Sequence, residues 1–291
     1  TPSTRSPIRP DPEDLPMHAL LNIAVRAARR AGDYAARNLG RLEKVEVVSK
    51  GRNDFVSDVD RAAERDIIET IRKAYPHHAI LGEEGGALAG APPRNRYEAE
   101  DEVEWIIDPL DGTTNFLHGF PQFCVSIGVK VRGRIEHGVV YDPNRQELYT
   151  ASRGGGAMLD GRRLRVSQTR TLESALIGTG IPFRANLRWK DAYLKMLGSV
   201  MDHAAGVRRP GAAALDLAYV AAGRFDGFFE LGLSPWDTAA GVLLIQEAGG
   251  NVGTLTGKAY DDRGHLVAGS PRTYQALLEV LRPHLPDDLV D

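Results

Sequence analysis

Five acidic side chains are the residues of this sequence best suited to chemistry: Glu83, Glu84, Asp108, Asp111 and Asp237. Each follows an expected strand or opens an expected helix. If they converge, a cation must neutralise them, because carboxylates a few ångströms apart suppress one another's ionisation. All-oxygen ligands favour Mg²⁺, Mn²⁺ or Ca²⁺ over zinc. A pair of such ions suits the hydrolysis of a phosphate ester, since the ions activate water and hold phosphate oxygens.

These acids also have ordinary structural explanations. Asp-Pro and Asp-Gly dipeptides are common in turns, so Asp108 and Asp111 could simply shape a loop. Asp60 and Asp237 stand at the starts of expected helices, where a carboxylate caps free backbone N–H groups. The adjacent charges of Glu83-Glu84 would ordinarily lie in water. Local patterns alone leave both interpretations open.

The stretch from Val103 to Phe116 predicts a buried strand that runs into a tight polar turn. An apolar run over Val103–Ile107 indicates the strand. We expect Asp108-Pro109 to end it, because proline has no backbone N–H and restricts the residue before it. Gly112 permits a tight backbone, and Thr113-Thr114-Asn115 suits a turn or a helix start.

Helix-like and strand-like stretches alternate around this turn, which predicts an α/β fold. The expected helices cover Met17–Leu39, a segment after Asp60, Lys190–His203, Gly211–Ala222, Asp237–Ala248 and Tyr274–Leu281. The other expected strands are Val45–Val48, Ala79–Gly82, Phe123–Val131, Ile135–Tyr141, Glu147–Ser152, Ala175–Gly178, Phe225–Glu230 and Leu266–Ala268.

Composition narrows the class of protein. A chain of 291 residues with 42% hydrophobic content can bury a sizeable core. The net charge of −3 gives no overall basic field for nucleic acid. Cys124 is the only cysteine, so no intrachain disulfide is possible, which suits a reducing cytoplasm. No apolar run approaches the ~20 residues of a membrane span.

The chain is expected to divide into an extension and a folded domain. Residues 1–16 are rich in proline and polar residues, which predicts a disordered N-terminal extension. Residues 17–291 are expected to form the catalytic domain, as two closely packed halves of about 17–170 and 171–291.

Three stretches resemble signature motifs of the inositol monophosphatase family: Glu83-Glu84-Gly85, Trp105–Phe120 and Pro235–Gly241. The similarity extends from Met17 over essentially the whole remaining chain and is greatest to bacterial inositol-1-monophosphatases. It implies a layered α/β sandwich of alternating helices and sheets. It also implies a magnesium-dependent phosphatase, usually a homodimer sensitive to lithium.

The resemblance assigns roles to particular residues. The metal ligands that it implies are Glu83, Glu84, Asp108, the backbone carbonyl of Leu110, Asp111, Asp237 and, for a weaker metal, Asp60. Thr113 and Glu83 match the pair that orients the attacking water. The implied substrate contacts are Asp111, the backbone of Gly112 and Thr113, Gly211, Ala212, Ala213, Glu230 and Asp237. Lys50 and Asp54 sit on what resembles the family's mobile loop.

The expected reaction is hydrolysis of myo-inositol 1-phosphate by direct attack of a metal-activated water. Ser234 departs from several animal members, which carry histidine there, so the choice among inositol phosphates stays open. Histidinol phosphate and other small phosphate esters are alternative substrates within the family. Bacterial proteins similar to this one can also interact with the transcription machinery. Five residues offer a candidate basic surface for that role, although a solvated face is the better explanation of them: Arg184, Arg188, Lys190, Arg208 and Arg209.

Overall fold

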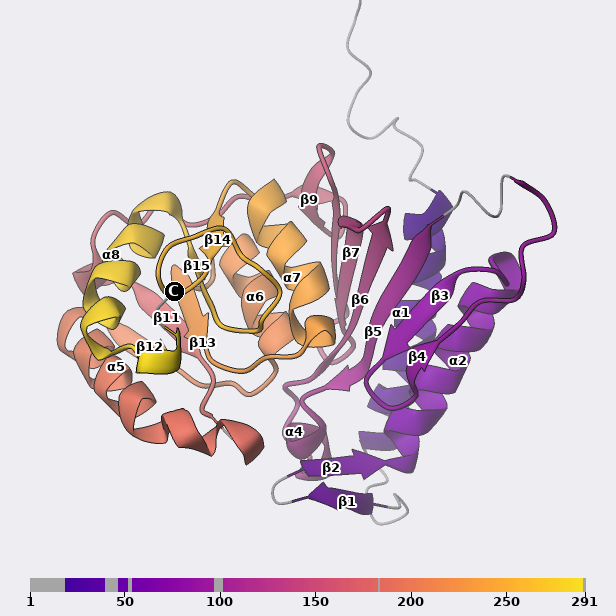
Figure 1. Cartoon of the computed structure of the whole chain (residues 1–291), viewed down its shortest axis with the longest axis horizontal. Coiled ribbons are helices and arrows are strands. Elements are labelled where there is room, and N and C mark those ends of the chain that lie inside the picture. The colour runs from indigo at the N-terminus through magenta and orange to yellow at the C-terminus, as the bar shows by residue number, and fades with distance from the viewer. Residues whose placement is uncertain (1–18, 40–46, 52–53, 97–101, 183, 290–291) are drawn as a thin grey trace, which may run out of the picture.

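The computed structural model describes residues 19–39, 47–51, 54–96, 102–182 and 184–289. Within these ranges, helices and two main sheets alternate in five layers, in the order helices, sheet, helices, sheet, helices (Figure 1). The predicted layered α/β fold is therefore confirmed. The predicted extension, residues 1–16, falls outside the described ranges.

The first sheet consists of β3 (Ala79–Gly82), β4 (Gly86–Leu88), β5 (Val103–Asp111), β6 (Cys124–Val131), β7 (Arg134–Asp142), β8 (Glu147–Ser152), β9 (Gly156–Leu159) and β10 (Arg162–Arg163). Its strand order is β10-β9-β8-β7-β6-β5-β3-β4. Only β3 and β5 pair in parallel; the other neighbours are antiparallel. The central strands are buried over most of their length because helices cover both faces.

The second sheet consists of β11 (Leu176–Thr179), β12 (Gly206–Arg208), β13 (Gly227–Glu230), β14 (Asn251–Gly253) and β15 (Leu266–Gly269). Its order is β12-β11-β13-β15-β14, with β11 parallel to both of its neighbours and β15 antiparallel to both of its own. A separate antiparallel pair joins β1 (Val47–Gly51) to β2 (Asp54–Ser57).

Three pairs of helices complete the layers (Figure 1). The outer pair on the first sheet is α1 (Ala19–Leu39) and α2 (Asp58–Ala74), the inner pair is α6 (Ala213–Ala221) and α7 (Pro235–Glu247), and the outer pair on the second sheet is α5 (Lys190–His203) and α8 (Pro271–Leu281). The short elements are α4 (Thr113–Leu117), η3 (Leu172–Ser174), η4 (Arg184–Trp189), η5 (Arg282–His284) and η6 (Asp287–Leu289). None of the helices in the described ranges is long and apolar enough to span a bilayer.

Small residues bring the layers close together. Helix α1 buries a stripe of alanines, including Ala24, Ala27 and Ala31, against α2 and the first sheet. On the opposite face, a Cβ added at Gly138 of β7 would lie 2.9 Å from the backbone oxygen of Ala240 in α7. Helix α7 therefore lies directly on the sheet at Ala240.

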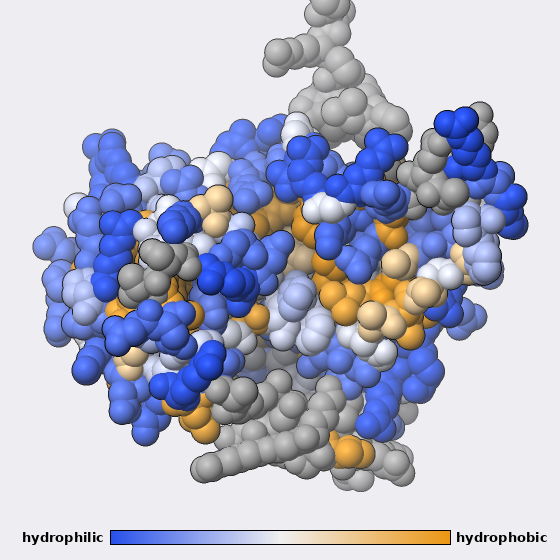
Figure 2. Space-filling view, viewed as in Figure 1, coloured by the Kyte–Doolittle hydropathy of each residue, from blue (hydrophilic) through white to orange (hydrophobic). Residues whose placement is uncertain are grey.

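The face shown in Figure 2 is mostly hydrophilic, as expected when the hydrophobic core lies between the layers. Hydrophobic residues show mainly between the two halves and near β4. The predicted division near residue 170 stays a prediction. The first sheet ends at Arg163 and the second begins at Leu176, but α6 contacts both sheets.

The structure corrects the expected end of the central strand. Pro109 does not end β5, which continues to Asp111. The pairing with β6 shifts register there, since Asp108 faces Ser126 and Asp111 faces Cys124. A proline is accommodated at such an irregularity because the missing N–H falls where no ladder hydrogen bond is made.

The role of Asp60 at the start of α2 is also corrected. The residue before the helix is Ser57, whose side-chain oxygen accepts from the backbone N–H of Asp60. Asp60 is the third helical residue and its carboxylate accepts from the backbone N–H of Ser57 at 2.9 Å. The two residues form a reciprocal capping box rather than a single cap.

We predict that Gly138→Ala lowers the melting temperature by roughly 5 °C, because the added methyl group must push α7 away from the sheet. Gly198→Ala is the matched control, since nothing lies within 4 Å of a Cβ at that position in α5. Alanine is the better helix former, so this control should melt at the wild-type temperature or above. Thermal unfolding followed by circular dichroism compares the two, and a Gly138→Ala protein as stable as wild type would show that the close contact is not limiting.

Candidate functional site

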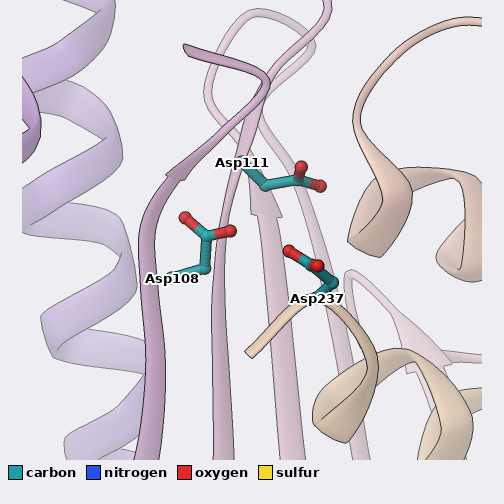
Figure 3. Close-up of side chains that lie close together, drawn as sticks. All are labelled: Asp108, Asp111 and Asp237. Carbon is teal, nitrogen blue, oxygen red and sulfur yellow. The ribbon is translucent and has the colours of Figure 1, made fainter. Parts of the chain in front are cut away.

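Three carboxylates meet where β5 ends and α7 begins. One carboxylate oxygen from each of Asp108, Asp111 and Asp237 lies within 4.8 Å of the other two. Figure 3 shows the three side chains close together, with Asp108 and Asp111 on β5 and Asp237 on the first turn of α7. Asp108 and Asp111 are buried, whereas Asp237 is half-buried. The structure therefore brings together three of the five acids that the sequence singled out.

A backbone N–H group anchors each of these carboxylates. The N–H of Leu110 donates to Oδ1 of Asp108 at 2.9 Å, and the N–H of Ala214 donates to Oδ2 of Asp111 at 2.7 Å. Oδ2 of Asp237 accepts from the N–H of Ser234 at 2.7 Å, within a second capping box. The anchors come from the irregular end of β5 and from two helix starts, so the geometry of the cluster follows from the backbone.

Burial and mutual repulsion control the ionisation of the cluster. Burial, followed by the charges of Glu83, Asp111 and Asp237, raises the pKa of Asp108 well above its ordinary value. Burial also raises the pKa of Asp111 to about 6, against the hydrogen bond from Ala214. Such a group favours a proton or a cation, because either relieves the repulsion.

The donor set fits a hard divalent cation. All three clustered groups are carboxylates, and no histidine or cysteine joins them among the described residues. The nearby thiol of Cys124 is buried and donates to Oδ2 of Asp111 at 3.7 Å. Burial raises the pKa of this thiol, which keeps it protonated and unsuited to zinc. Mg²⁺ or Mn²⁺ suits these oxygen ligands.

The cluster opens into a cleft of about 470 Å³. Most of the predicted site residues line it: Glu83, Asp108, Leu110, Asp111, Gly112, Thr113, Gly211, Ala212, Ala213, Glu230, Ser234 and Asp237. They come from the ends of β3, β5 and β13 and the starts of α6 and α7. The two sheets and the helices between them therefore all contribute to one polar cleft.

Asp60 and Glu84 lie beside the cleft and do not line it. Asp60 is fully buried, and its Oδ1 accepts from the hydroxyl of Thr113 at 2.9 Å. Burial raises the pKa of Asp60, although hydrogen bonds from Ser57 oppose the shift. The N–H of Glu83 donates to the carbonyl of Ile107 at 3.1 Å, which holds the end of β3 beside β5.

For Lys50 and Asp54, which were expected on a mobile loop, the structure describes the strands but not the side chains. Lys50 lies in β1 and Asp54 opens β2, which pair as an antiparallel hairpin. Their side chains lie outside what the structure describes.

Sequence reasoning missed residues whose partners are distant in the chain. The amide of Asn115 donates to the carbonyl of Gln122 at 2.7 Å and to that of Pro210 at 2.9 Å. These bonds tie the segment that follows β5, Gly112 and the first turn of α4 (residues 112–115, hereafter the β5 turn), to the segment before α6. Asp216 is buried in α6 and lines the cleft, and burial raises its pKa well above the ordinary value. Asp216 could have been recognised in the sequence as a single acid in the alanine-rich stretch of the expected helix.

Residues 17–285 match the sequence profile of the inositol monophosphatase family, which covers most of the chain. The chain belongs to this family. The matched range includes both sheets and every residue of the three-carboxylate cluster.

Members of the inositol monophosphatase family with known names or structures are similar over nearly the whole chain. The Nus factor SuhB of Pseudomonas aeruginosa is 56% identical over 275 residues, which are 94% of this chain and 99% of that protein. The crystal structure of extragenic suppressor protein suhB from Bartonella henselae has a TM-score of 0.86 and 43% identity, covering 92% of this chain and 100% of that chain. The staphylococcal SaIMPase-II, described as inositol monophosphate bound, has a TM-score of 0.73 and 27% identity, covering 91% of this chain and 95% of that chain.

We predict that the protein in a chelator loses stability as the pH rises from 5.5 to 8.5. Burial and the charge of Asp237 raise the pKa of Glu230 to about 8. The folded protein therefore keeps a proton that the unfolded chain releases near pH 4.5, so the free energy of unfolding falls with pH until about 8.

Melting temperatures measured across this range should fall by several degrees in the wild type and by less in Glu230→Gln. An equal fall in both proteins would show that Glu230 does not carry the effect.

Proposed function

We propose that this chain is a magnesium-dependent phosphomonoesterase that hydrolyses myo-inositol 1-phosphate and related small polyol phosphates. The observation that carries the proposal is the meeting of Asp108, Asp111 and Asp237 within 4.8 Å in a polar cleft. Membership of the family supports the phosphatase class. The inositol monophosphate bound to SaIMPase-II supports the choice of substrate.

The proposed cation ligands are the carboxylates of Glu83, Asp108, Asp111 and Asp237 and the carbonyl of Leu110, with Glu84 and Asp60 completing the set. When bound, Mg²⁺ would supply Lewis acidity that polarises phosphate oxygens and favours deprotonation of water. The backbone anchors of Asp108 and Asp111 hold these ligands in place without further rearrangement. Preorganised ligands of this kind lower the cost of stabilising charge during the reaction.

Thr113, whose hydroxyl is held by Asp60, and Glu83 are proposed to orient the attacking water. The hydroxyl of Thr113 donates to Oδ1 of Asp60, so its oxygen can accept a hydrogen bond from water in the cleft. Because the carboxylate of Asp60 takes the hydroxyl hydrogen, it fixes the direction of the lone pairs on the oxygen of Thr113. Glu83, which lines the same cleft, is the second proposed partner of the water.

The substrate is proposed to lie between the β5 turn and the second sheet. Backbone N–H groups of Gly112 and Thr113 face the phosphate in this arrangement, while Glu230 and the Gly211–Ala213 segment contact the polyol. A carboxyl group distinguishes a polyol from a plain phosphate, because it pairs with hydroxyls that the simpler ester lacks. The position of Ser234 in the cleft leaves histidinol phosphate as the nearest alternative substrate.

We predict that Asp111→Asn reduces phosphate release from myo-inositol 1-phosphate by about a hundredfold or more, because it removes one charge from the cation site. The assay follows phosphate in Mg²⁺, in EDTA and in Mg²⁺ with lithium. Asp202→Asn is the matched control, since Asp202 is exposed on α5 far along the chain from the cluster. A folded Asp111→Asn protein with near-normal turnover would contradict the proposed site.

Histidinol phosphate in the same assay separates the substrates. Preference for the inositol ester supports the proposal, while faster release from histidinol phosphate keeps the reaction and replaces the substrate. Release that continues in EDTA would rule out dependence on a divalent cation.

A second proposed function is association with the transcription machinery in the cytoplasm. The observation that favours it is the Nus factor description of relatives such as SuhB of Pseudomonas aeruginosa. Arg188 and Arg208 are exposed and Arg209 lines the cleft, and these residues are the proposed basic contacts. The protein is expected to act as a homodimer, which sedimentation of the purified chain would establish.

We predict that the chain copurifies with RNA polymerase or its elongation factors, and that Asp111→Asn leaves this association unchanged. The reason is that the substitution alters a buried carboxylate and not the exposed basic residues. The comparison uses tagged wild-type and variant protein recovered from cells at equal expression. The absence of these partners from the wild-type sample would count against the second function.

A further inference from the structure

Helix α2 carries two buried acids one turn apart, Asp60 and Glu64. The exposed fractions of these residues are 0% and 5%. A spacing of four residues places both side chains on the same face of the helix. Asp60 reaches Thr113 on the β5 turn, as described above. Glu64 reaches a different segment, the turn between β3 and β4, and none of the proposed steps uses it.

The carboxylate of Glu64 fits into the turn that carries Glu83 and Glu84. The backbone N–H of Glu84 donates to Oε1 of Glu64 at 3.1 Å. A Cβ added at Gly82 would lie 2.1 Å from Oε1, and one added at Gly85 would lie 3.0 Å from Oε2. Glycine at these positions therefore leaves the space that the carboxylate occupies.

The glycines of this turn give its backbone many accessible conformations, so other contacts must hold it in one of them. Three of the five residues over 82–86 are glycine, and Gly86 adopts a φ of +66°. Glycine permits many backbone conformations, so an unanchored turn would place its side chains poorly. The bond from Glu83 N–H to Ile107 fixes the strand side of the turn. The hydrogen bond from the N–H of Glu84 to the carboxylate of Glu64 fixes the peptide between Glu83 and Glu84.

A carboxylate is a costly choice for a purely structural contact. Burying an acid with few partners opposes folding, whereas an apolar side chain of similar size would pack at no such cost. A charged acceptor forms a stronger hydrogen bond with a backbone N–H than a neutral one does. Glu64 therefore lowers the stability of the fold through its burial but holds the turn through a strong hydrogen bond.

We infer that Glu64 is a positioning residue, which holds the Glu83-Glu84 turn through the N–H of Glu84 and thereby aims Glu83 into the cleft. The inference rests on the proposed function in so far as Glu83 binds a cation. Helix α2 therefore contacts both turns. Asp60 accepts from Thr113 on the β5 turn, and Glu64 accepts from Glu84 on the β3–β4 turn.

The test compares Glu64→Ala, Glu64→Gln and a control, Glu69→Ala, which changes an exposed acid of the same helix. We expect Glu64→Ala to weaken binding of Mn²⁺, measured by calorimetry, by about tenfold, as loss of a group supporting a metal ligand typically does. The Mg²⁺ concentration for half-maximal phosphate release should rise by a similar factor, with a smaller change in kcat at saturating Mg²⁺. Glu64→Gln should retain most of the affinity, because its amide oxygen accepts the same bond.

Gly82→Ala provides a second variant that changes the turn from the other side. Its added methyl group must displace the carboxylate of Glu64, so we expect a similar loss of Mn²⁺ affinity. Wild-type affinity in both Glu64→Ala and Gly82→Ala would overturn the inference. A loss in Glu64→Gln as large as that in Glu64→Ala would also overturn it, because the hydrogen bond would not be what matters.

Amide hydrogen exchange separates this inference from the proposed function. Exchange at Glu84 should become about tenfold faster in Glu64→Ala than in Glu69→Ala, whether or not a cation binds. A wild-type protein that neither binds Mn²⁺ nor releases phosphate would refute the proposed function, while the exchange at Glu84 would still decide the role of Glu64. Equal exchange in the two variants would refute the role of Glu64 alone.

Discussion

The repulsion among carboxylates gathered at the end of β5 is the constraint on which the site depends. Asp108 and Asp111 are buried, and their raised pKa values express the cost of holding them ionised together. The protein opposes this cost with oriented backbone donors, of which the N–H of Ala214 is the closest to Asp111. The remaining repulsion favours binding of a cation. A bound cation would relieve this repulsion and so stabilise the folded protein.

Long-range contacts bring the parts of the site together. The first sheet supplies Asp108 and Asp111, and the helices between the sheets supply Asp237 and the donor from Ala214. Asn115 joins the β5 turn to the segment that precedes α6. Because α7 lies directly on the first sheet at Gly138, a shift of this helix would also move Asp237. The cleft is thus a property of the packed layers, and neither sheet contains it alone.

Local patterns in the sequence predicted the longer helices and strands, whereas the short strands β4, β9, β12 and β14 were not predicted. Lys190–His203 is a helix at the predicted bounds, and the acids of the Asp108–Asp111 turn lie beside Asp237. The roles of Asp60 and Asp237 in their helices were less well predicted, because the signal is a serine three residues earlier in each case. The partners of Asn115 and Glu64 could not be found from local patterns, because they are carbonyl and N–H groups brought near only by tertiary packing.

The irregular pairing at Pro109 has a consequence for the direction of side chains. Successive residues of a regular strand point to opposite faces, so positions three apart, such as Asp108 and Asp111, would diverge. On β6, however, only two steps separate their partners, Ser126 and Cys124. The one extra residue in β5 changes the parity of the pleat and turns both acids toward the same side. Deleting a single residue there would restore a regular ladder and separate the two carboxylates.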